Sequence, residues 1–184
     1  LAVLLSVQVA DAQTKTPEAA KKAVESAEAA SKDAKKATKV ATWLKLASSY
    51  MDAYNAPAGS AWLGASKQEL QLIMGNDRPV SVEAVVLGTD QLIKETYSNK
   101  EFYFSPAGQL VLINVTQPVV EDALGGALEA YKKAYEVDAK KSKEKDITTG
   151  IETVSKKLYE DGMNYYSLDD YAKAVEYFAK AFEA

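Results

Sequence analysis

Hydrophobic residues recur at intervals of three and four along both ends of the chain, the spacing that places them on one face of a helix. Thr16 and Pro17 have the side chains expected at a helix start, because threonine caps a helix and proline suits its first position. The same spacing returns in the second half of the chain after a break. The predicted helices cover residues 16–30, 39–54, 119–138, 147–166 and 171–184.

The middle of the chain, residues 55–120, departs from this helical spacing. Ser66-Lys67-Gln68-Glu69 has the pattern of a capping box and predicts a short helix. A run rich in β-branched residues predicts a strand at 80–87, and two further strands, 101–104 and 109–115, are predicted to form a hairpin. Because a hairpin alone is marginally stable, we expect it to lean on helices or to pair with the 80–87 strand.

The first residues, Leu1–Ala10, are uncharged and mostly apolar, and Ala10-Asp11-Ala12 follows them. A short apolar core that ends in an A-x-A triplet is typical of a secretory signal peptide. We predict cleavage after Ala12 and a periplasmic or secreted protein; a buried helix or strand of a truncated domain is the alternative. Leu1 in the first position indicates a trimmed start, and the helical pattern that reaches Ala184 without a cap indicates that the natural protein continues.

Two missing residue types restrict the chemistry of the protein. The 184 residues include no histidine and no cysteine, which excludes catalysis by Ser–His or Cys–His pairs and removes the usual ligands of zinc, haem and iron–sulfur clusters. We therefore expect no metal site and no cofactor. The 26 acidic residues outnumber the 22 basic ones, which disfavours nucleic acid as a partner. No stretch is long and apolar enough to predict a membrane-spanning segment.

The most specific pattern lies in residues 155–184, SKKLYEDGMNYYSLDDYAKAVEYFAKAFEA, which resemble a tetratricopeptide repeat. The absent side chain of a glycine lets the partner helix approach closely, and small residues mark the helix crossing. Asp169-Asp170 is predicted to form the turn between the two helices and to cap the second. An ordinary amphipathic hairpin is the alternative interpretation. The matching residues are Leu158, Gly162, Tyr165, Ala174, Phe178 and Ala181.

A second match to the same family is divided along the chain. Its first helix would carry Trp43, Ala47 and Tyr50, and its second helix Ala127, Tyr131 and Ala134. Residues 55–120 lie between these halves, and we interpret them as an insertion between helices A and B of one repeat.

The resemblance implies a mainly α fold class: TPR-like helical hairpins in an α–α superhelix, with an inserted small α+β segment that contains a β-hairpin. After a signal peptide remnant at residues 1–12, we expect a single TPR-like domain over 13–184. Residues 155–184 would be its complete C-terminal repeat, and 55–120 its insertion.

Tetratricopeptide proteins bind an extended peptide or a helix of a partner in a groove lined by the first helix of each repeat. The resemblance therefore implies a non-catalytic, exported bacterial scaffold for a protein or peptide partner. In the alternative interpretation, Tyr159 and Met163 pack on a neighbouring repeat instead. The ligand-facing positions of the family fall on Leu44, Ser48, Met51, Lys156, Tyr159, Met163 and Tyr166.

A glycan is the alternative ligand, because eleven of the aromatic residues are tyrosines. Exported tyrosine-rich helical repeats of bacterial carbohydrate-uptake lipoproteins have a similar scaffold, and here Tyr97, Phe102 and Tyr103 are the candidate stacking residues. The lack of a cysteine anchor favours the protein-binding prediction. No enzyme is predicted, because adjacent acids such as Glu121-Asp122 are better explained as helix caps.

Overall fold

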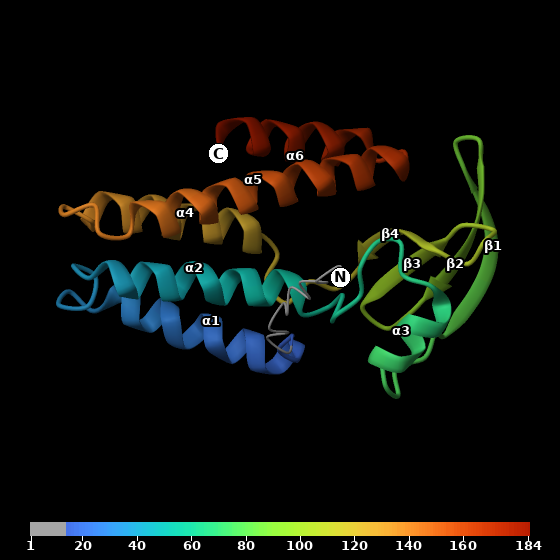
Figure 1. Ribbon diagram of the computed structural model, residues 1–184, viewed down its shortest axis with the longest axis horizontal. Helices are drawn as coiled ribbons and strands as arrows, with labels where there is room; N and C mark the ends of the chain where they lie inside the picture. Colours follow the sequence, from blue (N-terminus) through green and yellow to red (C-terminus); the bar gives the residue numbers. More distant parts are fainter. Residues whose placement is uncertain (1–13) are drawn as a thin grey trace, which may run out of the picture.

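The computed structural model describes residues 14–184, and the predicted signal peptide at residues 1–12 lies outside the described residues. The helices are α1 (Pro17–Lys32), α2 (Val40–Asn55), α3 (Lys67–Ile73), α4 (Ala123–Val137), α5 (Glu144–Ser167) and α6 (Tyr171–Glu183). The strands are β1 (Ser81–Leu87), β2 (Asp90–Thr96), β3 (Lys100–Phe104) and β4 (Leu110–Val115). Five helices form a stack at one end of the molecule, and α3 lies with the sheet at the other (Figure 1).

The helix starts confirm the capping residues expected from the sequence. The Thr16 hydroxyl accepts a hydrogen bond from a backbone N–H in the first turn of α1, and Pro17 is the first helical residue. Both halves of the capping box are present at α3, where the side chains of Ser66 and Glu69 each satisfy a backbone N–H of the other residue. Asp170 caps α6 through its carboxylate. These contacts satisfy backbone donors that a helix end leaves free.

In the helical stack, α1 packs on α2, α2 on α4, α4 on α5, and α5 on α6. Three of these four interfaces share one steric feature: an aromatic ring of one helix lies directly against a glycine of the next. A Cβ atom at any of these glycines would lie under 3.0 Å from the ring, so with any other residue the ring or the helix that carries it would have to shift. The pairs are Tyr50 with Gly126, Tyr131 with Gly150, and Phe178 with Gly162.

Small buried residues allow the remaining close contacts between helices. Ala20, Val24, Ala53 and Ala56 form the core between α1 and α2. Farther along the stack, alanines that are almost fully buried occupy the crossings. The residues singled out by the repeat resemblance lie on α2 (Trp43, Ala47, Tyr50), α4 (Ala127, Tyr131, Ala134), α5 (Leu158, Gly162, Tyr165) and α6 (Ala174, Phe178, Ala181).

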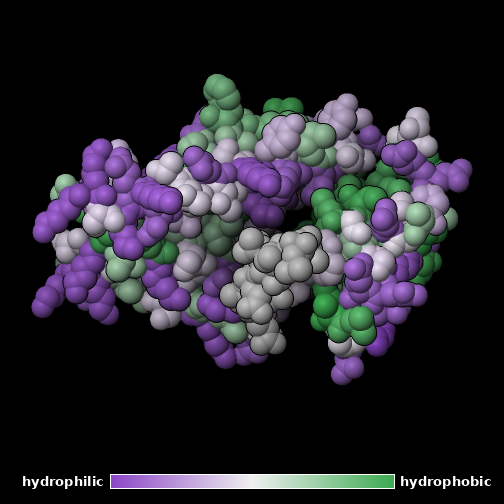
Figure 2. Space-filling view, in the orientation of Figure 1, coloured by the Kyte–Doolittle hydropathy of each residue, from purple (hydrophilic) through white to green (hydrophobic). Residues whose placement is uncertain are grey.

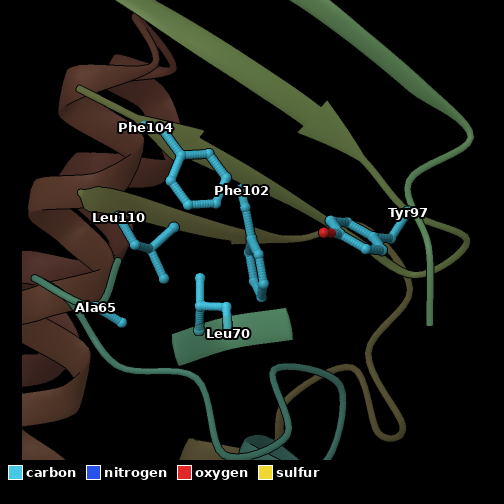
Figure 3. Close-up of a cluster of buried hydrophobic side chains, with 6 residues drawn as sticks. All are labelled: Ala65, Leu70, Tyr97, Phe102, Phe104 and Leu110. Atoms are coloured by element: carbon cyan, nitrogen blue, oxygen red, sulfur yellow. The ribbon is translucent and has the colours of Figure 1, made fainter. Parts of the chain in front are cut away.

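The sheet is an antiparallel meander in the order β1-β2-β3-β4, and its strands confirm those predicted at 80–87, 101–104 and 109–115. One face of the sheet packs on α3 through a separate hydrophobic core, which we call the sheet core. Figure 3 shows its side chains converging between α3 and the strands. The sheet core consists of Ala65, Leu70, Tyr97, Phe102, Phe104 and Leu110.

The predicted fold class is wrong. The described residues combine six helices with a four-stranded antiparallel sheet, so the chain is a mixed α and β structure rather than a mainly α helical repeat with a small β-hairpin. The sequence interpretation missed β2, because its charged residues obscure the alternation expected of a strand. In the sheet, Lys94 of β2 pairs with Glu83 of β1 at 2.7 Å, and this cross-strand ion pair accommodates the charge.

Replacing Gly162 with leucine should separate α5 from α6. The new side chain would meet the Phe178 ring at a buried crossing, so we expect Gly162→Leu to lower the free energy of unfolding by about 1–3 kcal/mol. Thermal and urea unfolding measure this change. Thr149→Leu, at an exposed position on the same helix, is the control. A melting temperature equal to that of the wild type would contradict the close packing at Gly162.

Candidate functional site

A cavity of about 700 Å³ lies between the helical stack and the sheet. Its walls come from the C-terminal end of α2, the start of α4, the C-terminal half of α5, α6, and β4 with its flanking loops. Figure 2 shows a hollow between the stack and the sheet on this face. The volume is within the range of small-ligand and peptide side-chain pockets, and the cavity is therefore the candidate functional site.

Tyrosine rings form much of the helical wall of the cavity. Tyr54 comes from α2, Tyr159 and Tyr165 from α5, and Tyr177 from α6. The rings of Tyr165 and Tyr177 are 5.0 Å apart between centroids and tilted by 47°, a favourable arrangement for two aromatic rings. Asn114 of β4 and Asn164 of α5 also line the cavity.

Asp161 is the most unusual group in this wall. The Tyr54 hydroxyl donates a 2.8 Å hydrogen bond to Asp161 Oδ1, which joins α2 to α5 across residues distant in sequence. Burial raises the pKa of the Asp161 carboxyl from its usual 3.8 to about 6, although the Tyr54 hydrogen bond and the positive charge of Lys157 oppose the shift. Burial and the neighbouring Asp161 charge also raise the pKa of Tyr54 well above its usual value. At neutral pH the cavity wall thus holds a poorly solvated carboxylate.

The structure brings two of the seven predicted ligand-facing residues to the cavity. Tyr159 and Met163 line it, and their side chains are 56% and 43% exposed, so both are accessible. Met51 instead packs against the hydrophobic cluster of α4 and α5. The Tyr166 ring lies on the Tyr171 ring, with 5.4 Å between centroids.

The remaining three predicted residues lie elsewhere. Lys156 is exposed and its ammonium group is 3.8 Å from the Glu160 carboxylate. Ser48 is exposed and donates its hydroxyl hydrogen to the carbonyl of Lys45, one turn earlier in α2. Leu44 is partly buried on α2 and does not line the cavity. The residues that sequence reasoning missed are Tyr54 and Asp161.

The aromatic residues proposed to stack on sugars cannot do so in this structure. Tyr97, Phe102 and Tyr103 are at most 6% exposed, because Tyr97 and Phe102 belong to the sheet core and Tyr103 is covered on the other face. A hydrogen bond joins Tyr103 to Glu101 on its own strand. A sugar would have to bind the tyrosines of the cavity instead.

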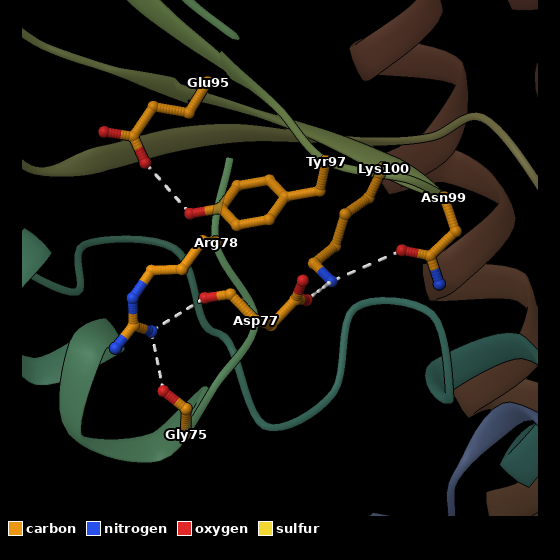
Figure 4. A network of polar contacts seen from close by, with 7 residues as sticks. All are labelled: Gly75, Asp77, Arg78, Glu95, Tyr97, Asn99 and Lys100. Carbon is orange, nitrogen blue, oxygen red and sulfur yellow. Dashed lines mark hydrogen bonds and ion pairs between the residues drawn. The ribbon is translucent and has the colours of Figure 1, made fainter. Parts of the chain in front are cut away.

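A second polar cluster lies at the edge of the sheet core, and Figure 4 shows its contacts. Lys100, only 4% exposed, forms a 2.6 Å ion pair with Asp77, and its ammonium group also lies 5.0 Å from the centre of the Tyr97 ring. The Arg78 guanidinium donates to the carbonyl oxygens of Gly75 and Asp77. These internal partners fix the loop between α3 and β1, so the cluster has a structural role.

No protein-family model matches the sequence, and neither a curated protein nor a solved structure is significantly similar to it. The resemblance to tetratricopeptide repeats therefore stays a prediction.

Within residues 14–184, no helix combines the length and the apolar character needed to cross a bilayer. In the same part of the chain, no three acidic side chains gather as a metal site would require. The residues that line the cavity supply tyrosine rings and hydroxyls, amides, carboxylates and ammonium groups.

The raised pKa of Asp161 makes the stability of the protein depend on pH. Between about pH 4 and pH 6 the folded protein keeps a proton that the unfolded chain has released, so this contribution to stability falls as the pH rises and is lost above about pH 6. Asp161→Asn should therefore gain stability relative to the wild type across this range, on the order of 2–3 kcal/mol in total.

Thermal unfolding of both proteins between about pH 4 and pH 7 measures this difference. Carboxylates whose pKa values are lowered in the fold, such as Glu101 and Asp138, are present in both proteins. Their contributions to the pH dependence therefore cancel when the two proteins are compared. Glu152→Gln, which removes an exposed carboxyl from the same helix, is the matched control. A difference between Asp161→Asn and the wild type that does not change with pH would contradict the shift.

Proposed function

We propose that the protein is a non-catalytic binding protein that holds a segment of a partner protein in the tyrosine-lined cavity. The observation that carries the proposal is the cavity itself, about 700 Å³ in volume and lined from both the helical stack and the sheet. A site of this size takes one or two side chains and the backbone between them.

The residues at the cavity suit protein recognition. Tyrosine offers a large apolar surface and a hydroxyl group with little loss of conformational freedom, and it is enriched where proteins bind one another. Met163 adds an unbranched side chain that adapts to irregular surfaces. The amide nitrogens of Asn114 and Asn164 donate within the fold, to Glu101 and to the carbonyl oxygen of Ile113, and each amide also has an oxygen that can accept from a peptide backbone.

The proposal is for binding without catalysis. The chain has no histidine or cysteine to serve as a nucleophile or as an acid–base group near neutral pH. Asp161, with its raised pKa, is the group that could transfer a proton, and its partner is the Tyr54 hydroxyl, whose pKa is raised rather than lowered as in an activated nucleophile. Reproducible turnover in a broad hydrolase screen would overturn this part of the proposal.

A glycan is the second candidate ligand. The specific observation in its favour is that four tyrosine rings share one cavity with carboxylates and amides, a combination that can stack on sugar rings and pair with their hydroxyl groups.

A peptide-display library tests the proposed function directly. Peptides selected on the wild type should fail to bind Met163→Trp, because the larger side chain fills the cavity mouth, and should still bind Val175→Trp. Val175 is exposed on α6 and does not line the cavity, so it is the matched control. Selected peptides that bind all three proteins equally would place the binding elsewhere. Binding on a glycan array that Met163→Trp abolishes, without any selected peptide, would favour the second candidate.

We also propose that the chain is exported, on the apolar run Leu1–Ala10 and the Ala10-Asp11-Ala12 triplet. Cleavage after Ala12 should give a mature protein that begins with Gln13. Mass spectrometry of the protein isolated from its native cells measures this end, and a protein that retains residues 1–12 would contradict the proposal.

A further inference from the structure

The lysines of the cavity already have partners within the fold. Lys157 forms an ion pair with Glu160 at 3.3 Å, and Lys173 forms one with Asp170, also at 3.3 Å. The Lys173 ammonium group lies over the Tyr165 ring as well, 5.0 Å from its centre. Both lysines therefore have a partner for their charge within the fold.

The carboxylates of the cavity are not balanced in the same way. Asp122 and Glu176 share Lys180, at 3.4 Å and 2.9 Å. In the described part of the chain, Asp161 and Glu121 have no ion pair although both line the cavity. The Lys157 charge that acts on Asp161 is shared with Glu160, and Asp122 and Glu176 have one lysine between them. The cavity lining therefore carries a net negative charge, and the Asp161 carboxylate lies in a poorly solvated part of it.

A poorly solvated carboxylate without an ion pair favours a positively charged ligand. A cation would restore the electrostatic stabilisation that burial takes from Asp161, whereas an anion would be repelled and a neutral sugar would leave the charge unbalanced. The Tyr54 hydroxyl already occupies Asp161 Oδ1, and its hydrogen bond fixes the carboxylate so that Oδ2 can accept from a second donor. Tyrosine rings beside the carboxylate add a favourable surface for a cation.

We propose that the cavity selects a partner segment with a lysine or arginine side chain, whose cationic group binds the Asp161 carboxylate beside the Tyr54 ring. This inference rests on the proposed function and specifies the chemistry of its ligand. Glu121, exposed at the cavity, adds long-range attraction for the same cation.

Small probes test this recognition without knowledge of the partner. We would titrate ¹⁵N-labelled protein with the Nα-acetyl methylamides of lysine, arginine and norleucine and follow amide shifts. The lysine and arginine probes should shift resonances of residues around the cavity, and norleucine, which has the same apolar stem without the charge, should not. Raising the salt from about 20 mM to about 500 mM should weaken the binding of the charged probes.

Two isosteric variants separate Asp161 from general charge effects. Asp161→Asn should weaken the binding of both charged probes about tenfold, the loss expected for one charge-assisted hydrogen bond. Glu152→Gln removes the same charge from an exposed position on α5 outside the cavity and should leave the affinity within about twofold of the wild type.

The outcomes distinguish this inference from the proposed function. Equal affinity of Asp161→Asn and the wild type, or norleucine binding as tightly as lysine, would overturn the inference. Display peptides that need the open cavity but carry no lysine or arginine would also overturn it and leave the proposed function standing. If neither peptides nor probes bind at the cavity, both proposals fail.

Discussion

The close contact between aromatic rings and glycines is the interaction on which the helical stack depends. At the three interfaces that join α2, α4, α5 and α6, a ring rests where a Cβ atom would otherwise stand. α5 takes part in two of these contacts, through Gly150 with α4 and Gly162 with α6, so its position is fixed at both sides. Asp161 directly precedes Gly162 in the chain. The packing of Phe178 on Gly162 therefore also determines the position of Asp161 in the cavity wall.

The cavity lies between two parts of the molecule whose hydrophobic cores do not merge. The sheet core lies between α3 and the strands, and the other hydrophobic clusters belong to the helical stack. Where α5 passes β4, the link between them is polar: the Asn164 amide donates to the carbonyl oxygen of Ile113 at 3.5 Å. Since apolar burial does not draw these surfaces together, the space between them stays open to a ligand.

Local signals in the sequence predicted most of the helices and strands but few of the contacts between those that are distant in the chain. Capping residues, apolar spacing and β-branched runs located the helices and three of the strands, because these signals act within a few residues. The close approach at Gly162 was also predictable, since a glycine inside a strong helical pattern has a packing reason. β2 was missed because its stability comes from partners in other strands, such as the pairing of Lys94 with Glu83.

The candidate site was harder to predict for the same reason. Tyr159 and Met163 were identified from the ligand-facing positions of the tetratricopeptide family that residues 155–184 resemble. Tyr54 and Asp161 are 107 residues apart, and nothing local connects them. The available signal was an acid beside the apolar stripe of α5, at three residues from Leu158 and four from Tyr165. An acid in this position ordinarily faces solvent, and the sequence does not indicate that a tyrosine of α2 covers it.

At Asp161, the side chain that would best stabilise the fold differs from the one that the proposed function requires. Its burial disfavours the ionised form that it takes at neutral pH, so it lowers the stability of the folded protein there. An amide could accept the same hydrogen bond from Tyr54 without that cost, so the fold alone does not account for a carboxylate. A ligand that supplies a positive charge does account for it, because the ion pair would form in a poorly solvated wall, where electrostatic attraction is stronger than at the surface.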